Sequence, residues 1–275
     1  MHATLQRRCL ALAFVMAASA CGGARGEPSS TAAAPCLIDL SYTFDDDTVY
    51  WPTAPSKFQK ETLSYGLTHS GYFYSAFVIA TPEHGGTHID APIHFAEGHA
   101  TTEAIPLERL IAPGVVIDMT GAAASDRDAL LTVEHIDAFE REHGSIQPGT
   151  IVLIRTGWAK YWPDLERYLG DDIPGDVSNL HFPGISEQAA RALVARKVAA
   201  VGIDAASIDH GPSKEFMAHR VLMEAGIPAF ENVAALDQVP ARGARIIALP
   251  MKIGGGSGGP LRIVAEVPAT QCGNG

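Results

Sequence analysis

Short runs rich in valine and isoleucine alternate with helical patterns along this chain, and this alternation constrains it to the α/β class. Each run is bounded by glycine, proline or aspartate, as buried strands usually are. The pattern therefore predicts strands at residues 37–40, 76–80, 115–119, 150–155 and 198–203.

Three segments between these runs carry the end signals of helices. Thr132 is a candidate N-cap for a helix through residues 133–140. The segment from Ser186 to Lys197 has acids in its first turn and bases in its last, which matches the helix dipole. A third helix is predicted from Phe216 to Ala225, where Gly226 ends it. Residues 39–81 have many β features and no clear helix, so we expect β-rich parts beyond a doubly wound sheet.

The N-terminus is expected to lie outside the fold. Residues 1–20 have two arginines, a short apolar run and the small-residue cleavage site Ala18-Ser19-Ala20, which together indicate a secretory signal and a periplasmic protein. Cys21 follows as in a lipoprotein box, although Ala18 stands where leucine is usual, so lipidation and plain cleavage are the alternatives. Residues 21–35 are predicted to form a flexible tether, and residues 36–275 a single domain.

Two cysteines remain at the ends of this domain, Cys36 and Cys272. Because an exported protein meets an oxidising compartment, we expect a disulfide between them, with two unpaired thiols as the alternative. The chain has no CxxC pair, which argues against a thiolate zinc site.

Charge restricts the possible partners. The chain carries a formal net charge of −11, and 47% of its residues are hydrophobic. The apolar content is sufficient for a folded core, and the acidity argues against nucleic acid and anionic membrane surfaces as partners.

Residues 84–94, with the sequence HGGTHIDAPIH, place three imidazoles and one carboxylate in eleven positions. Neutral imidazole and carboxylate groups suit Zn²⁺, Mn²⁺ or Fe²⁺. His88 and Asp90 are two residues apart, so they share one face of an extended chain. Gly85 and Gly86 allow the backbone to bend and bring His84 to the same centre.

These four side chains do not complete a metal site, so we expect a second contribution from later in the chain. His219 lies in the third predicted helix, and Glu231 follows the apolar run 227–230. A glutamate directly after a buried strand must be paired or metal-bound to be tolerated there.

The eleven-residue segment resembles the HxGTHxDxPxH signature of the cyclase-like metal-dependent hydrolases, the family of bacterial kynurenine formamidase and isatin hydrolase. Other pieces similar to the family follow in the same order along the chain: Asp39-Leu-Ser41, Trp51-Pro52, Thr156-Gly-Trp158, Gly202-Ile-Asp204, Ser207-Ile-Asp209, His219, Glu231-Asn232 and residues 249–262.

The resemblance implies a swivelling β/β/α fold, with a β-barrel-like core and flanking helices, in a homodimer or higher homo-oligomer. It also implies a set of five metal ligands and one acid/base residue, His94. The five ligands would be His84, His88, Asp90, His219 and Glu231. The two carboxylates would allow one or two divalent ions, Zn²⁺ or Mn²⁺.

The activity implied is that of a metal-dependent amidohydrolase acting on an aryl formamide such as N-formylkynurenine or a cyclic aryl amide such as isatin. A bound metal would activate water for attack on the carbonyl, and His94, titrating near neutral pH, would move protons to the leaving amine. An aromatic wall for the aryl group is expected from Trp51, Tyr72, Phe73 and Tyr74, with ordinary core packing as the alternative.

Two other functions are compatible with the sequence. Because tryptophan breakdown is normally cytoplasmic, an exported enzyme of this family could hydrolyse another lactam or a lactone. A non-catalytic lipoprotein that binds a metal or ligand is the second alternative. His94 favours an enzyme, since a binding protein has no need of a histidine beyond Pro92 that is not a ligand.

Overall fold

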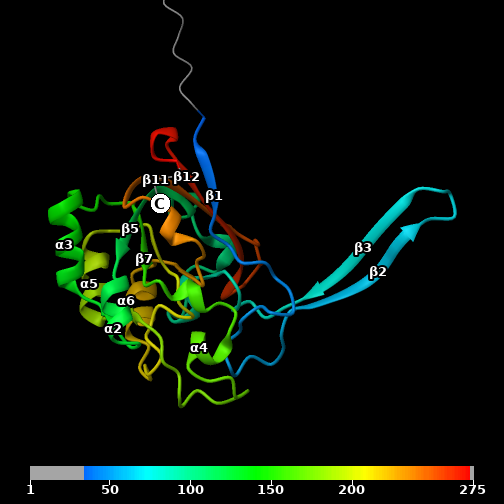
Figure 1. The fold of residues 1–275 in the computed structure, drawn as a ribbon, viewed down its shortest axis with the longest axis horizontal. Helices are drawn as coiled ribbons and strands as arrows, with labels where there is room; N and C mark the ends of the chain where they lie inside the picture. Colours follow the sequence, from blue (N-terminus) through cyan, green and yellow to red (C-terminus); the bar gives the residue numbers. More distant parts are fainter. Residues whose placement is uncertain (1–33, 273–275) are drawn as a thin grey trace, which may run out of the picture. The chain divides into compact units, whose positions relative to one another are not determined.

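Seven strands close into a barrel in the computed structural model of this chain, which describes residues 34–272 (Figure 1). Their order around the ring is β12-β11-β5-β7-β9-β10-β4, and pairing of β4 with β12 closes it. The strands are β4 (His88–Asp90), β5 (Ile111–Asp118), β7 (Ile151–Arg155), β9 (Ala200–Ile203), β10 (Ala229–Glu231), β11 (Arg242–Pro250) and β12 (Gly258–Val267). The four strands from β5 to β10 are parallel, and the other pairs are antiparallel.

The strands divide their side chains between two apolar clusters. In β7, Ile151 and Leu153 belong to one cluster with residues of β4, β10 and β12, while Val152 and Ile154 pack against helices. This alternation follows from the two-residue period of a strand. The second cluster includes residues from α3, α5 and α6, so these helices cover one side of the barrel. The helices are α1 (Leu107–Leu110), α2 (Thr120–Ser125), α3 (Val133–His143), α4 (Leu165–Leu169), α5 (Glu187–Ala195) and α6 (Met217–Glu224).

The expected α/β class, with a barrel-like core and flanking helices, is confirmed. Thr132 caps α3 in a capping box with His135, and the Ser186 side chain at the start of α5 accepts a hydrogen bond from the Ala189 amide at 3.1 Å. Helix α6 begins after Phe216, whose φ of 48° is left-handed. The predicted signal, Cys21 and nearly all of the tether lie outside the described residues. Within residues 34–272, no helix is long and apolar enough to cross a membrane.

One predicted strand has surroundings different from those expected. Residues 76–80 do form part of a strand, β3 (Phe73–Ala80), but among the described residues it pairs only with β2 (Gln59–Leu67), and it is exposed rather than buried. The two strands form a hairpin that extends away from the barrel (Figure 1). The apolar residues alone could not show this, because burial depends on what else packs against them.

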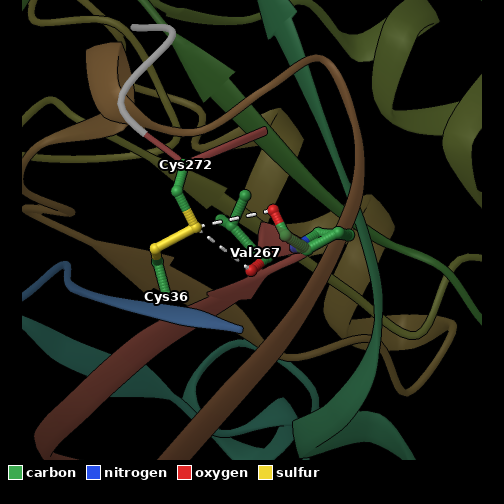
Figure 2. Close-up of a disulfide and its surroundings, with 4 residues drawn as sticks. Cys36, Val267 and Cys272 are labelled. Carbon is green, nitrogen blue, oxygen red and sulfur yellow. Dashed lines mark hydrogen bonds between the residues drawn. A yellow bond between two sulfur atoms is a disulfide. The ribbon is translucent and has the colours of Figure 1, made fainter. Parts of the chain in front are cut away.

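The two ends of the described chain are joined covalently. Strand β1 (Cys36–Asp39) pairs with the C-terminal part of β12, and Cys36 forms a disulfide with Cys272 across a Cα–Cα distance of 5.9 Å (Figure 2). The expected disulfide is therefore confirmed. A short parallel pair, β6 (Leu130–Leu131) with β8 (Gly184–Ile185), completes the strands.

Candidate metal centre

His84 follows β3 and is succeeded by two glycines at which the backbone bends. A larger residue at either position would force neighbouring side chains to move. Gly86 has a φ of +56°, and Gly85 a φ of +151°. A Cβ atom on Gly85 would lie 2.1 Å from the Tyr50 ring, and one on Gly86 would lie 2.7 Å from the Phe44 ring. The bend predicted at these glycines is therefore present, and two aromatic rings fill the space that side chains would occupy.

Strand β4 carries the next two side chains and lies between β10 and β12. The register places His88 opposite Glu231 and Asp90 opposite Ala229. The Nε2 atom of His88 is 3.3 Å from Asp90 Oδ1 and 3.5 Å from Glu231 Oε2. His84 approaches the same carboxylate, with Nδ1 2.7 Å from Asp90 Oδ1. The first part of the centre is thus built from one strand, one bend and one cross-strand pair.

His219 on α6 and Glu231 at the end of β10, which the sequence analysis named as further candidate ligands, lie beside the same carboxylate. The Nε2 atom of His219 is 3.4 Å from Asp90 Oδ2 and 3.2 Å from Glu231 Oε1. His219 and Glu231 are both buried. All five side chains expected to bind metal therefore lie together, although the first and last are separated by more than a hundred residues of sequence.

The donor atoms form two groups that share one carboxylate. His84, His88 and Asp90 make the first group, and Asp90, His219 and Glu231 make the second, with the donor atoms of each group within 4.8 Å of one another. The Nε2 atom of His88 is buried and has no hydrogen-bond partner among the described residues. An orphaned imidazole nitrogen beside two carboxylates fits a divalent cation, which would satisfy it.

Neighbouring groups orient the imidazoles toward this centre. The Nδ1 atom of His88 lies 3.0 Å from the Gly86 carbonyl oxygen, and that of His219 lies 2.7 Å from Asp209 Oδ2. Protonation of each Nδ1 leaves the Nε2 lone pair directed at the carboxylates, which is the usual arrangement of metal-binding histidines. Asp209 is itself held by the backbone amides of Ala218 and His219, at 3.0 and 3.1 Å.

The loop before β12 supports His84. Ser257 Oγ lies 2.9 Å from His84 Nε2 and donates a hydrogen bond of 2.7 Å to Glu83 Oε2. A Cβ atom on Gly258 would lie 2.6 Å from the His84 ring, so a larger residue there would displace the imidazole. Neither Ser257 nor Glu83 was assigned a role from the sequence, because their contacts join segments more than 170 residues apart.

The electrostatics of the centre favour positive charge at its imidazoles. Burial lowers the pKa of His88, but Asp90 and Glu231 outweigh it and raise that pKa to about 9. Burial also opposes the charged form of His219, yet Asp209, Asp90 and Glu231 hold its pKa well above the ordinary value. The buried Asp90 carboxyl keeps a pKa well below its usual range because these imidazoles surround it. A divalent cation would offset the negative charge of the buried carboxylates as these protons do.

His94 lies apart from the carboxylates, at the end of a 3₁₀ turn (Pro92–His94). Its ring stacks on His84 with centroids 3.9 Å apart and meets Phe95 edge-on at 4.7 Å. The ring is exposed toward the cavity, yet the protein packed around it still lowers its pKa to about 4, and nearby imidazoles add to that shift. The expectation of a pKa near neutrality is therefore corrected: His94 is a neutral imidazole at pH 7.

A cavity of about 280 Å³ opens onto the centre. Its floor is polar, formed by the six histidine and carboxylate side chains described above, and its walls are largely apolar. The wall residues are Val49, Tyr50, Trp51, Gly85, Phe95, Leu169, Ala206, Ser207, Phe216 and Asn232. Apolar walls around a few polar groups are typical of small-molecule sites.

Only one of the four expected wall aromatics lies at this cavity. Trp51 lines it, whereas Tyr72, Phe73 and Tyr74 are exposed on the β2–β3 hairpin and do not line it within the chain. The prediction for those three residues is corrected, because they lie where β2 turns into β3, at the end of the hairpin that is far from the barrel (Figure 1). Their place is taken by Tyr50, Phe95 and Phe216, each close in sequence to a predicted site residue.

Comparisons with known proteins identify the family of this chain. The Cyclase family model matches residues 38–210. An isatin hydrolase from Roseibium aggregatum is 37% identical over 206 residues, which cover 72% of this chain and 77% of the relative. A kynurenine formamidase from Salinibacter ruber is 29% identical over 230 residues, covering 83% of this chain and 96% of the relative.

The structural likeness extends over most of the chain. A solved isatin hydrolase bound to the product analogue thioisatinate matches with a TM-score of 0.79 and 32% identity, over 86% of this chain and 93% of that one. The resemblance first seen in residues 84–94 is confirmed by these matches.

Proposed function

The chain belongs to the cyclase family, and from this premise we propose that it hydrolyses the C–N bond of an aryl formamide or a cyclic aryl amide. The observation that carries the proposal is the pair of donor groups that share Asp90 at the floor of an aromatic cavity. Relatives named isatin hydrolase and kynurenine formamidase support both substrate types.

Each polar group of the cavity has a part in this proposal. The five clustered side chains would hold one or two divalent ions, which would polarise a carbonyl oxygen and make water more acidic. His94, neutral at pH 7, accepts a proton from the water that adds to the carbonyl carbon. It then returns this proton to the nitrogen as the C–N bond breaks, so the products are a carboxylic acid and an amine.

The aryl group fits the apolar part of the cavity. Trp51, Phe95 and Phe216 present flat rings at its walls, and aromatic rings bind one another in stacked or edge-on arrangements. A volume of about 280 Å³ leaves room for one small bicyclic molecule.

Turnover by the full-length protein tests the proposal. The metal-free protein would be reloaded with Zn²⁺ or Mn²⁺ and assayed with isatin, N-formylkynurenine and an aryl lactone, with Asp90→Ala as the control for contaminating enzymes. Hydrolysis of isatin or the formamide by wild type alone is the expected result. Turnover of the lactone only would support a lactone hydrolase instead, and metal binding without any turnover would favour a binding lipoprotein.

We further propose that the centre holds two ions, Zn²⁺ or Mn²⁺, because Asp90 belongs to both donor groups. Elemental analysis should then give two ions per chain in wild type, one in His219→Ala and none in Asp90→Ala. Wild-type metal content in His219→Ala would remove the second donor group from the proposal.

The N-terminal segment is proposed to export and anchor the protein. In this proposal residues 1–20 direct export to the periplasm, Cys21 carries lipid, and residues 21–35 tether a single domain at 36–275. The Cys36–Cys272 disulfide supports an oxidising compartment. Cell fractionation should place wild type with membranes and Cys21→Ser in the soluble periplasm. An unchanged distribution would argue against the anchor.

We also propose that the protein is a homo-oligomer, as its family resemblance implies.

A further inference from the structure

Asn232 directly follows the candidate ligand Glu231 and is buried, and its side chain joins distant parts of the chain. Its Nδ2 atom donates a hydrogen bond of 2.7 Å to the Gly86 carbonyl oxygen. Its Oδ1 atom accepts one of 2.9 Å from the Tyr168 hydroxyl group. Asn232 lines the cavity, but both polar atoms of its side chain already have partners in the protein. The side chain is therefore placed to hold other groups rather than to bind a substrate.

The backbone of Asn232 makes two further contacts. Its carbonyl oxygen accepts a hydrogen bond of 2.8 Å from the Thr87 hydroxyl, and its amide donates one of 3.0 Å to the Ala205 carbonyl oxygen. Gly86 and Thr87 are the two residues before His88, and they lie 146 and 145 positions from Asn232 in the sequence. Asn232 therefore fixes the segment that leads into one candidate ligand, while it directly follows another.

The backbone conformation at Asn232 limits which residues can take this position. Its φ of 54° lies in the left-handed region, which asparagine adopts more readily than most residues with a side chain. The position also needs an N–H donor that reaches the Gly86 carbonyl. Asparagine meets both requirements, and glycine would meet only the first.

The Gly86 carbonyl oxygen is an acceptor that Asn232 shares with His88. The Nδ1 atom of His88 lies 3.0 Å from this oxygen, which has two lone pairs and can accept both N–H groups. Gly86 has no side chain to hold its peptide group, so the bond from Asn232 keeps the carbonyl within reach of His88. A proton held on Nδ1 leaves Nε2 of His88 free to face Asp90 and Glu231, at 3.3 and 3.5 Å.

We propose that Asn232 is a positioning residue, which determines through the Gly86 carbonyl that His88 binds metal through Nε2. The inference rests on the proposed metal-dependent function and adds a residue to it. His88 belongs to the first donor group and Glu231 to the second, so the contacts of Asn232 also hold the two groups in place relative to one another.

The experiment measures Zn²⁺ affinity of full-length variants by competition with a chelator. Asn232→Gly removes the side chain and keeps the left-handed backbone, and Tyr168→Phe is the matched control, because it removes the buried hydrogen bond at Oδ1 of the same amide. Asn232→Gly should weaken binding about 10- to 100-fold, and Tyr168→Phe should leave it unchanged. In a His88→Ala background Asn232→Gly should cause no further loss, because its effect acts through His88.

Nitrogen NMR of ¹⁵N-histidine-labelled, Zn²⁺-loaded wild type needs no substitution at Asn232. The His88 signals, identified by their absence from His88→Ala, should show a protonated Nδ1 and a coordinated Nε2. Coordination through Nδ1 would overturn the inference. Equal losses of affinity in Asn232→Gly and Tyr168→Phe, or equal losses from Asn232→Gly with and without the His88 side chain, would reduce Asn232 to a structural role. A wild type that binds no Zn²⁺ would instead overturn the proposed metal centre itself.

Discussion

The Nδ1 atom of His219 lies 2.7 Å from Asp209 Oδ2, so the opposite ring nitrogen is directed at Asp90 and Glu231. Asp209 thus determines which nitrogen of a candidate ligand faces the centre, without touching the centre itself. It is a positioning residue, and the backbone amides that hold it come from the first turns of the same helix, α6.

Replacing this carboxylate should weaken metal binding. In Asp209→Asn the amide no longer fixes the His219 ring as a charged acceptor does, so we expect a 10- to 100-fold loss of affinity for one ion. Competition with a fluorescent chelator measures it. Asp204→Asn is the matched control, because Asp204 is equally buried but holds Thr156 and Gly157 instead. Equal metal affinity in the two variants would show that Asp209 does not position His219.

Metal binding by the free protein should release protons. His88 has a pKa of about 9, raised from its ordinary value, so it is protonated at pH 8 and must lose that proton to bind a metal. The apparent affinity for the metal should therefore rise with pH up to about 9, by about tenfold per pH unit for each proton that the metal displaces. Calorimetry in buffers of different ionisation enthalpy counts the protons. Fewer should be released by His88→Ala, whereas an unchanged number would assign the protons to other groups.

The disulfide should stabilise the fold without affecting the metal centre. Cys36 and Cys272 are separated by 236 residues, so the bond restricts nearly the whole unfolded chain. Replacing both by serine should lower the free energy of unfolding by about 2–5 kcal/mol. Urea denaturation measures this loss, and metal content on the same preparation should equal that of wild type. A variant as stable as wild type would contradict the assigned role.

The parts of this structure that the sequence predicted are those with local signals. The spacing of His88 and Asp90, the glycines before them and the caps at Thr132 and Ser186 all act within a few residues. Barrel closure depends on the pairing of β4 with β12, which joins segments about 170 residues apart, and no local pattern specifies that register.

The expected aromatic wall is a second case in which local sequence did not predict long-range structure. Tyr72, Phe73 and Tyr74 carry the composition of a substrate pocket or of a core, and composition does not reveal that they lie exposed at the far end of a hairpin outside the barrel. His219 and Glu231 were named from the sequence because an incomplete cluster called for further ligands, and the family resemblance supported them. Asp209 and residues 249–262 also resemble the family, but the contacts that give Asp209 and Ser257 their roles became visible only in the folded chain.

His94 provides the sharpest test of the proposed chemistry, since it lines the cavity but lies outside both donor groups. His94→Ala should keep its fold and metal content while kcat falls by about 10²- to 10⁴-fold, the usual contribution of a general acid–base group. His99→Ala, which removes a histidine outside the cavity, is the matched control and should retain wild-type kcat.

The pH dependence of the activity tests the direction in which the pKa of His94 is shifted. Because the pKa of His94 is lowered to about 4, the ring stays neutral and able to accept a proton at all higher pH values. Its contribution should therefore be lost only as pH falls through about 4, and no limb near pH 6.5 should belong to it. A limb near pH 6.5 that disappears in His94→Ala would contradict the lowered pKa. Loss of metal together with activity in that variant would instead make His94 a ligand.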